Sequence, residues 1–263
     1  MKKLMLVLFA FALITSACEK TEDDDGGGDD NVSSLNPTAT QLGFAINYTA
    51  TWCGPCGNWG APRVHKYAED APKGAVMTAH ASGDPMHNSA LYGSLSGDRP
   101  TGGGIPSFWV GDKSSAGDGD MVALLASGNA KAGVDISFEK SGNTMTVKTK
   151  TKFFSPDAGE YYLSVLVLED GIDGSSSSGN YSQNGVADPA TYKHDFVLRA
   201  SSITGNAYGE LIKSNPGDGF TVEKTYTISL DASWVNTYPV AIIWKKTTSG
   251  SPSYMYINAM KKK

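Results

Sequence analysis

The sequence predicts an α/β domain followed by an all-β sandwich domain, and three observations carry this prediction. The length of 263 residues suits one large domain or two ordinary ones, and a 40% apolar content is enough for packed cores. Short apolar runs alternate with helical stretches in the first half, whereas from Val134 onward apolar and polar residues alternate as in strands. Thirty glycines and twelve prolines are typical of a chain rich in loops and strands. We therefore place the α/β domain at residues 37–133 and the β-sandwich at residues 134–263.

The charge and hydropathy of the chain exclude two classes of protein. The formal net charge of -5 provides no basic face for a phosphate backbone, so we expect no nucleic-acid partner. No apolar run after residue 17 reaches the length of a membrane-spanning helix, so we expect nothing in the mature chain to cross a bilayer.

Residues 1–17 have the pattern of a secretory signal peptide. Two lysines precede an apolar stretch at residues 4–14, and three small residues follow it. Cys18 comes directly after them, an arrangement that resembles a bacterial lipobox, although Thr15 stands where leucine is usual. By that resemblance Cys18 is the lipidated N-terminus of the mature protein and its anchor in a membrane. The alternative is an ordinary signal peptide followed by a chance cysteine.

An acidic, flexible tether is expected at residues 18–36. Seven acidic residues and one lysine lie between Cys18 and Asn31, together with three consecutive glycines. Such a stretch repels itself and has too few apolar residues to fold. An acidic run after a lipidated cysteine also resembles the surface-export signals of some Gram-negative lipoproteins. A plain solvated spacer is the alternative.

The only cysteines after Cys18 lie in the run Trp52-Cys53-Gly54-Pro55-Cys56. A structural disulfide would close too short a loop to remove much unfolded-state entropy. A zinc site needs four ligands, and the four histidines of the chain are scattered without ligand spacing, so we expect no metal or other cofactor. A redox-active dithiol fits this spacing best.

The residues around the dithiol favour the same interpretation. An apolar run at 44–48 predicts a buried strand, and the stretch from 56 to about 70 predicts a helix. The N-terminus of a helix stabilises a thiolate through its dipole and free N–H groups. We therefore expect Cys53 to be an exposed nucleophile with a lowered pKa, and Cys56, one turn inside the helix, to be the resolving thiol.

A second element follows about fifty residues later, where Gly104-Ile105-Pro106 precedes the apolar strand 107–110. A proline there cannot lie centrally in a ladder, but it can occupy a turn in the cis form. The run WCGPC followed by GIPSFWV resembles the thioredoxin fold. The resemblance implies that Pro106 is a cis-proline facing the dithiol and that Ile105 pairs its backbone with the substrate chain. On this basis the substrate groove comprises Trp52, Gly54, Pro55, Ile105 and Pro106.

Two residues depart from the thioredoxin pattern. Asn47 lies six positions before Cys53, where that family carries a buried acid that helps to deprotonate the resolving thiol. The proline that kinks the active-site helix is displaced by one residue to Pro62. These departures bear on the rate and direction of the redox reaction.

The remainder of the first half predicts a strand at 75–79, a short helix around 88–95 and a last helix from 118 to about 126. His80, Asp84 and His87 lie close together in the sequence. They suggest either a polar loop or a metal or proton-relay site beside the dithiol, and the absence of ligand spacing favours the loop.

The second half predicts a hairpin and five further strands. The hairpin joins residues 134–139 and 144–154, and the second of its strands alternates cleanly between apolar or threonine residues and lysines. Seven short strands with turns rich in glycine, serine and asparagine predict a β-sandwich. The five further strands are expected at 161–168, 192–198, 221–230, 240–244 and 254–259.

The whole arrangement resembles the family named after a twenty-eight-kilodalton outer-membrane protein. That family carries a strand ending in Glu-Asp, a glutamine-containing loop, then Tyr-x-His before a strand ending in Leu-Arg. The corresponding residues here include Glu169, Gln183, His194 and Arg199. Glu169, His194 and Arg199 could form a second site, but a polar network that pins the loop 171–190 is the favoured interpretation.

Together these inferences predict an outer-membrane lipoprotein of a bacterial cell envelope, periplasmic or surface-exposed, with thiol–disulfide oxidoreductase activity. Its expected partners are extracytoplasmic protein thiols or disulfides, an unidentified electron donor, and the membrane through its N-terminal lipid. The Gly-Pro pair inside the dithiol resembles that of reducing thioredoxins. The rival hypothesis is a non-enzymatic surface lipoprotein whose β-sandwich binds a partner and whose dithiol is vestigial; Asn47 favours it.

Overall fold

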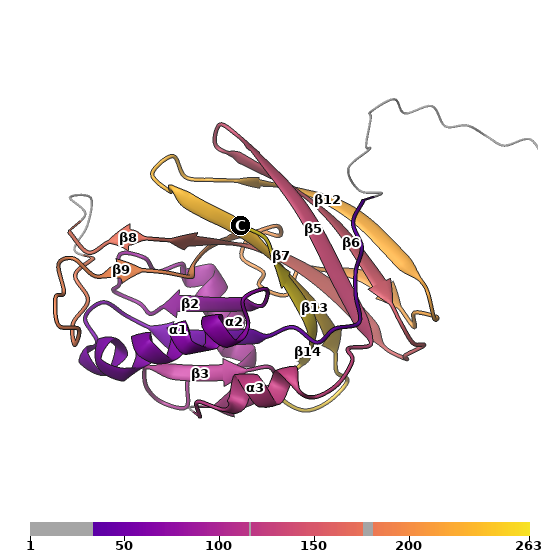
Figure 1. Ribbon diagram of the computed structural model, residues 1–263, viewed down its shortest axis with the longest axis horizontal. Helices are drawn as coiled ribbons and strands as arrows, with labels where there is room; N and C mark the ends of the chain where they lie inside the picture. Colours follow the sequence, from indigo (N-terminus) through magenta and orange to yellow (C-terminus); the bar gives the residue numbers. More distant parts are fainter. Residues whose placement is uncertain (1–33, 116, 176–180) are drawn as a thin grey trace, which may run out of the picture.

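The computed structural model describes residues 34–115, 117–175 and 181–263 (Figure 1). The expected signal peptide, the lipidation site Cys18 and all but the end of the expected tether lie outside these residues. No helix among the described residues is long and apolar enough to span a membrane.

The first half consists of four strands and three helices. Strand β1 lies in the middle, parallel to β2 on one side and antiparallel to β3 on the other, and β4 pairs antiparallel with β3. The elements are β1 (Phe44–Thr49), a π-helical turn η1 (Cys56–Gly60), α1 (Ala61–Asp70), β2 (Ala75–His80), α2 (Ser89–Asp98), β3 (Ser107–Val110), β4 (Lys113–Ser115) and α3 (Asp120–Leu125). The expected strands and helices of this half are confirmed, and β4 is an addition.

Strands β1 and β2 are buried along their whole length because both faces of the sheet are covered. Ala45 and Val76 pack with residues of α1 and α3, whereas Ile46 and Met77 pack on the other face with Leu91 and its neighbours from α2. Central strands buried on both faces are expected to be continuously apolar. The polar residue Asn47 within β1 is therefore an exception that needs an explanation.

The second half is β-rich, in agreement with the sequence. Its strands are β5 (Ala132–Ser141), β6 (Thr144–Phe153), β7 (Glu160–Asp170), β8 (Ile172–Asp173), β9 (Lys193–His194), β10 (Val197–Ser201), β11 (Glu210–Ser214), β12 (Thr221–Ser229), β13 (Asn236–Lys246) and β14 (Tyr254–Lys261). The hairpin β5–β6 and the strand alternation in β6 are confirmed. The strand expected at 192–198 is divided into β9 and β10, with Phe196 between them at a φ of 62°. Strands β8 and β11 were not expected.

One nine-stranded sheet runs through both halves, in the order β14-β13-β7-β10-β2-β1-β3-β4, with β11 also paired to β7. The halves join where β10 runs parallel to β2, at Val197 opposite Thr78, and the N–H of Thr78 donates to the Phe196 carbonyl at 2.8 Å. The expected boundary between residues 133 and 134 falls inside β5. The sheet is thus shared, and the division into two domains stays a prediction.

A second sheet, in the order β12-β6-β5, faces the β7 and β13 part of the large sheet, as Figure 1 shows. Alternate residues of β7 explain how one strand serves two cores. Leu163 and Val165 point to the three-stranded sheet, whereas Leu166 and Leu168 join the apolar cluster that includes β1 and α2. This face-to-face packing is consistent with the expected β-sandwich.

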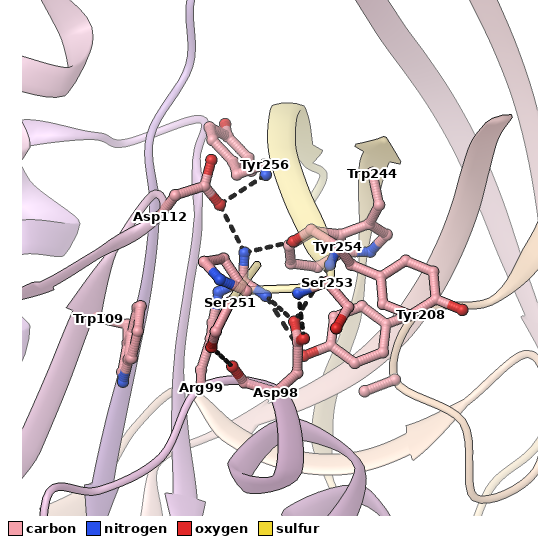
Figure 2. Close-up of polar contacts among 12 residues, drawn as sticks. Asp98, Arg99, Trp109, Asp112, Tyr208, Trp244, Ser251, Ser253, Tyr254 and Tyr256 are labelled. Atoms are coloured by element: carbon pink, nitrogen blue, oxygen red, sulfur yellow. Dashed lines mark hydrogen bonds and ion pairs between the residues drawn. The ribbon is translucent and has the colours of Figure 1, made fainter. Parts of the chain in front are cut away.

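A fully buried arginine, Arg99, ties the two halves together (Figure 2). Its guanidinium donates to Asp98 at 2.8 Å and to Asp112 at 2.6 Å, both in the first half. It also donates to the Tyr254 carbonyl at 2.7 Å and lies 4.8 Å from the ring centre of Trp244, both in the second half. No local sequence pattern predicts this network, because it joins residues up to 155 positions apart.

Candidate functional site

Cys53 and Cys56 form a disulfide at the start of the first helix, with an S–S distance of 2.13 Å and a Cα–Cα distance of 5.2 Å. Cys56 opens the turn η1, and the N–H of Ala61 donates to the Cys56 carbonyl across that turn. A π turn holds one residue more than an α-helical turn. The extra residue agrees with the displacement of the kinking proline to Pro62, which lies in the first turn of α1.

The Cys53 side is the more accessible side of the disulfide, but the expectation that Cys53 is exposed was wrong. Cys53 is 6% exposed and Cys56 is 1% exposed. Trp52, immediately before the pair, is 52% exposed. The N–H of Cys56 lies 3.2 Å from Cys53 Sγ, as expected for a helix N-terminus that stabilises a developing thiolate.

The loop with Pro106 covers one side of the disulfide. The Ile105–Pro106 peptide bond is cis, as the sequence predicts, and the Ile105 carbonyl oxygen lies 3.6 Å from Cys53 Sγ. Gly60 allows this approach, because a Cβ there would lie 2.9 Å from Pro106 Cβ. The sequence elements at 52–56 and 104–106 therefore meet in one site.

A loop from the second half covers the other side. The buried side chain of Gln183 donates to the carbonyls of Ala50 and Cys53, both at 3.2 Å. The N–H of Asn184 donates to the Thr51 carbonyl at 2.7 Å. Gly185 contacts Gly54 so closely that a Cβ on Gly185 would lie 1.8 Å from the Gly54 carbonyl oxygen. This contact fixes the backbone of the dithiol loop, while the Cys53 side chain itself is buried among Ala50, Ala81 and Ile105.

A small polar cavity of about 20 Å³ lies behind Cys56. Asn47 Oδ1 is buried and has no hydrogen-bond partner among the described residues. Buried polar atoms are nearly always paired with protein or water, so a polar cavity next to β1 accounts for Asn47 in an otherwise apolar strand. The lining residues are Asn47, Thr49, Cys56, Ala61, Val64, His65, Thr78, His80, Gln183, Tyr192, His194 and Asp195.

The charge state of the cavity wall follows from a buried His–Asp pair. His80 Nδ1 lies 3.1 Å from Asp84 Oδ2, and both side chains are buried. Burial alone would raise the pKa of Asp84, but its close pairing with His80 and its backbone donors, the N–H groups of Thr51 and Met86, lower that pKa to about 2. Asp84 is thus an anion near neutral pH. No group of three or more metal-ligating side chains within residues 34–115, 117–175 and 181–263 could hold a metal ion.

The three residues of the expected second site do not form one cluster. Arg199 Nε donates to Glu169 Oε2 at 2.8 Å, and the other Glu169 oxygen accepts from the Val235 N–H at 2.9 Å. His194 instead lines the cavity behind Cys56, with its ring 5.8 Å from that of His80. Burial lowers the pKa of His194 to about 4. His194 also bonds the Tyr181 carbonyl oxygen at 2.6 Å, within the loop 171–190, which agrees with the favoured interpretation of a polar network that pins this loop.

No protein-family model matches the chain, and no curated protein matches it. Among solved structures it is similar to a domain of the outer membrane lipoprotein Omp28 from Porphyromonas gingivalis, at 18% identity and a TM-score of 0.29, over 49% of this chain and 89% of that one. It is also similar to β-glucosidases from Listeria innocua and Kluyveromyces marxianus, at 14% and 13% identity and TM-scores of 0.23. Those two matches cover 50% of this chain but only 16% and 14% of the respective β-glucosidase chains. TM-scores this low carry no argument about function.

Proposed function

We propose that this protein is a thiol–disulfide oxidoreductase of a bacterial cell envelope and that Cys53 and Cys56 are its redox pair. The observation that carries the proposal is the disulfide at a helix N-terminus, with the cis Ile105–Pro106 bond against Cys53. In this mechanism Cys53 attacks a substrate disulfide, and Cys56 resolves the mixed disulfide that results.

The fold of the first half supports the proposal. Its strand order β2-β1-β3-β4, with β3 antiparallel, places the dithiol just after the end of the central strand β1, as a thioredoxin-like unit would require. Trp52, Gly54, Pro55, Ile105 and Pro106 would form the groove for a substrate chain. The side chain of Trp52 is free to contact such a chain because about half of its surface is exposed.

The proposed setting is the outer membrane, on either face, with Cys18 as the lipid anchor. The N-terminal sequence supports it through the apolar stretch and small residues before Cys18. Extracytoplasmic protein thiols or disulfides are the proposed partners, together with an electron donor that is not identified.

A chromogenic aromatic disulfide tests the proposed chemistry directly. After reduction of the protein, attack by Cys53 releases one coloured thiolate, and resolution by Cys56 releases a second. Wild-type protein should show both phases, Cys56→Ser the first phase only, and Cys53→Ser neither. Equal first phases in the two variants would contradict the assignment of Cys53 as the nucleophile.

The low exposure of Cys53 favours one alternative, a non-enzymatic lipoprotein whose second half binds a partner. Such a protein would keep the disulfide as a local staple beneath the Gln183 loop. Catalysed turnover separates the two functions, because a binder would show no dithiol-dependent reduction of the model disulfide under multiple-turnover conditions.

A further inference from the structure

The cavity behind Cys56 contains the groups needed to move a proton. Cys56 and His80 both line it, although they come from different elements, η1 and β2. We propose that His80 accepts the proton of Cys56 during resolution, through a water molecule held in this cavity, and returns it in the reverse reaction. This inference rests on the proposed function, because it assigns the base for the resolving step of that reaction.

The His80–Asp84 pair is oriented for this role. The Asp84 carboxylate oxygen at 3.1 Å favours a proton on His80 Nδ1 by charge, although this nitrogen makes no hydrogen bond of standard geometry among the described residues, and the Nε2 lone pair is then the acceptor. Asp84 is itself held by the N–H groups of Thr51 at 2.6 Å and Met86 at 2.8 Å. A fixed carboxylate beside a histidine both sets the tautomer and stabilises the imidazolium that forms.

The size and polarity of the cavity suit one water molecule. A volume of about 20 Å³ exceeds the roughly 10–15 Å³ that a water requires. Asn47 Oδ1, which has no partner among the described residues, can accept a hydrogen bond from that water. Asn47 then positions the water, whereas an acid at this position would itself have been the base.

The other titratable groups around the cavity are less suited to accept the proton. His194 Nε2 lies 2.6 Å from the Tyr181 carbonyl oxygen and donates to it, and burial lowers the pKa of this histidine to about 4. Asp195 accepts from the Gly171 N–H at 2.8 Å, and its side chain is 25% exposed. Two groups remain. His65 Nε2 lies 3.9 Å from Asp195 Oδ2. Burial raises the pKa of Tyr192 to about 12, so its hydroxyl stays protonated near neutral pH.

The step balances in atoms and electrons. The Cys56 thiol gives its proton to the water, and the water gives a proton to His80 Nε2. The Cys56 thiolate attacks Cys53 Sγ, the Cys53–Cys56 disulfide forms, and the bond between Cys53 and the substrate sulfur breaks. The substrate leaves as a thiolate, so the substrate disulfide has gained two electrons and the protein dithiol has lost two.

The two-phase trace with the aromatic disulfide isolates this step, because only its second phase requires deprotonation of Cys56. His80→Gln should leave the first phase unchanged and slow the second near neutral pH by about 100-fold, a common size for general base catalysis. His87→Gln is the matched control. His87 Nδ1 lies 2.6 Å from the His80 carbonyl oxygen but does not line the cavity, so this variant should change neither phase.

The pH profile and a rescue variant separate proton transfer from a structural effect. In His80→Gln the second phase should keep only the rise with pH that the Cys56 thiol itself produces. The double variant His80→Gln with Asn47→Asp has a carboxylate in the cavity wall, and this carboxylate should restore most of the rate of the second phase. Asp84→Asn, like His80→Gln, should slow the second phase.

Two results would overturn the assignment of His80. One is a second phase in folded His80→Gln with the wild-type rate and pH profile. The other is a second phase that is slowed as much in His87→Gln as in His80→Gln, or that is slowed in Asp195→Asn and not in His80→Gln. Absence of the first phase in wild-type protein would refute the proposed function itself, and the two failures are therefore distinct.

Discussion

Replacing Arg99 by methionine should destabilise the protein more than any surface substitution. The change removes the guanidinium from both aspartates: Asp98 keeps the N–H groups of Ser253 and Tyr254 as donors, and Asp112 keeps the Tyr256 N–H at 2.8 Å. Removal of one partner from a fully buried ion pair costs about 3–5 kcal/mol, and the 28% exposure of the Asp112 side chain places the cost here near the lower end of that range. The lost contact with Trp244 adds to this cost.

Arg63→Met provides the matched control and urea unfolding provides the assay. Arg63 pairs with Asp118 at 3.0 Å and lies 5.3 Å from the Trp59 ring centre, but the Asp118 side chain is 74% exposed. Exposed pairs of this kind contribute about 0–1 kcal/mol. The free energy of unfolding should therefore fall several times further in Arg99→Met. Equal losses in the two variants would refute the view that burial makes the Arg99 network essential.

Three further outcomes are expected. Folding lowers the pKa of His194 from 6.5 to about 4, so between pH 6.5 and pH 4 the unfolded chain binds a proton that the folded protein does not. The free energy of unfolding should therefore fall by up to roughly 3 kcal/mol as the pH drops through that range. His194→Gln should flatten this part of the pH profile of unfolding. Gln183→Leu should cost about 0.5–1.5 kcal/mol in urea unfolding, because it removes the side-chain hydrogen bonds to the carbonyls of Ala50 and Cys53, which keep only the backbone N–H groups of Cys53 and Gly57 as donors. Cys18→Ser should move the protein to the soluble fraction or leave an uncleaved precursor, and unchanged membrane fractionation would argue against lipidation.

Local patterns in the sequence were sufficient to predict most elements of the fold. The apolar runs of β1 and β2 and the alternation in β6 determine strands without reference to the rest of the chain. The joining of the halves could not be predicted in this way. It depends on contacts between residues far apart in the sequence, such as the pairing of Val197 with Thr78 and the hydrogen bond from Arg99 to the Tyr254 carbonyl.

The candidate site was predictable only where its residues are close in sequence or belong to a known motif. Cys53, Cys56 and Pro106 were found on that basis. The hydrogen bond from Gln183 to the Cys53 carbonyl spans 130 residues, so no local pattern could reveal it. The role of His80 next to Cys56 likewise depends on the pairing of β2 with β1.

The reduction potential of the Cys53–Cys56 pair tests the central claim most directly. It is measured by equilibrating the protein with dithiol buffers and quantifying the two redox forms. A redox-active pair should give a value between about -270 and -120 mV, the range of known thiol–disulfide oxidoreductases. A value below about -300 mV would identify a structural disulfide and contradict the proposed function.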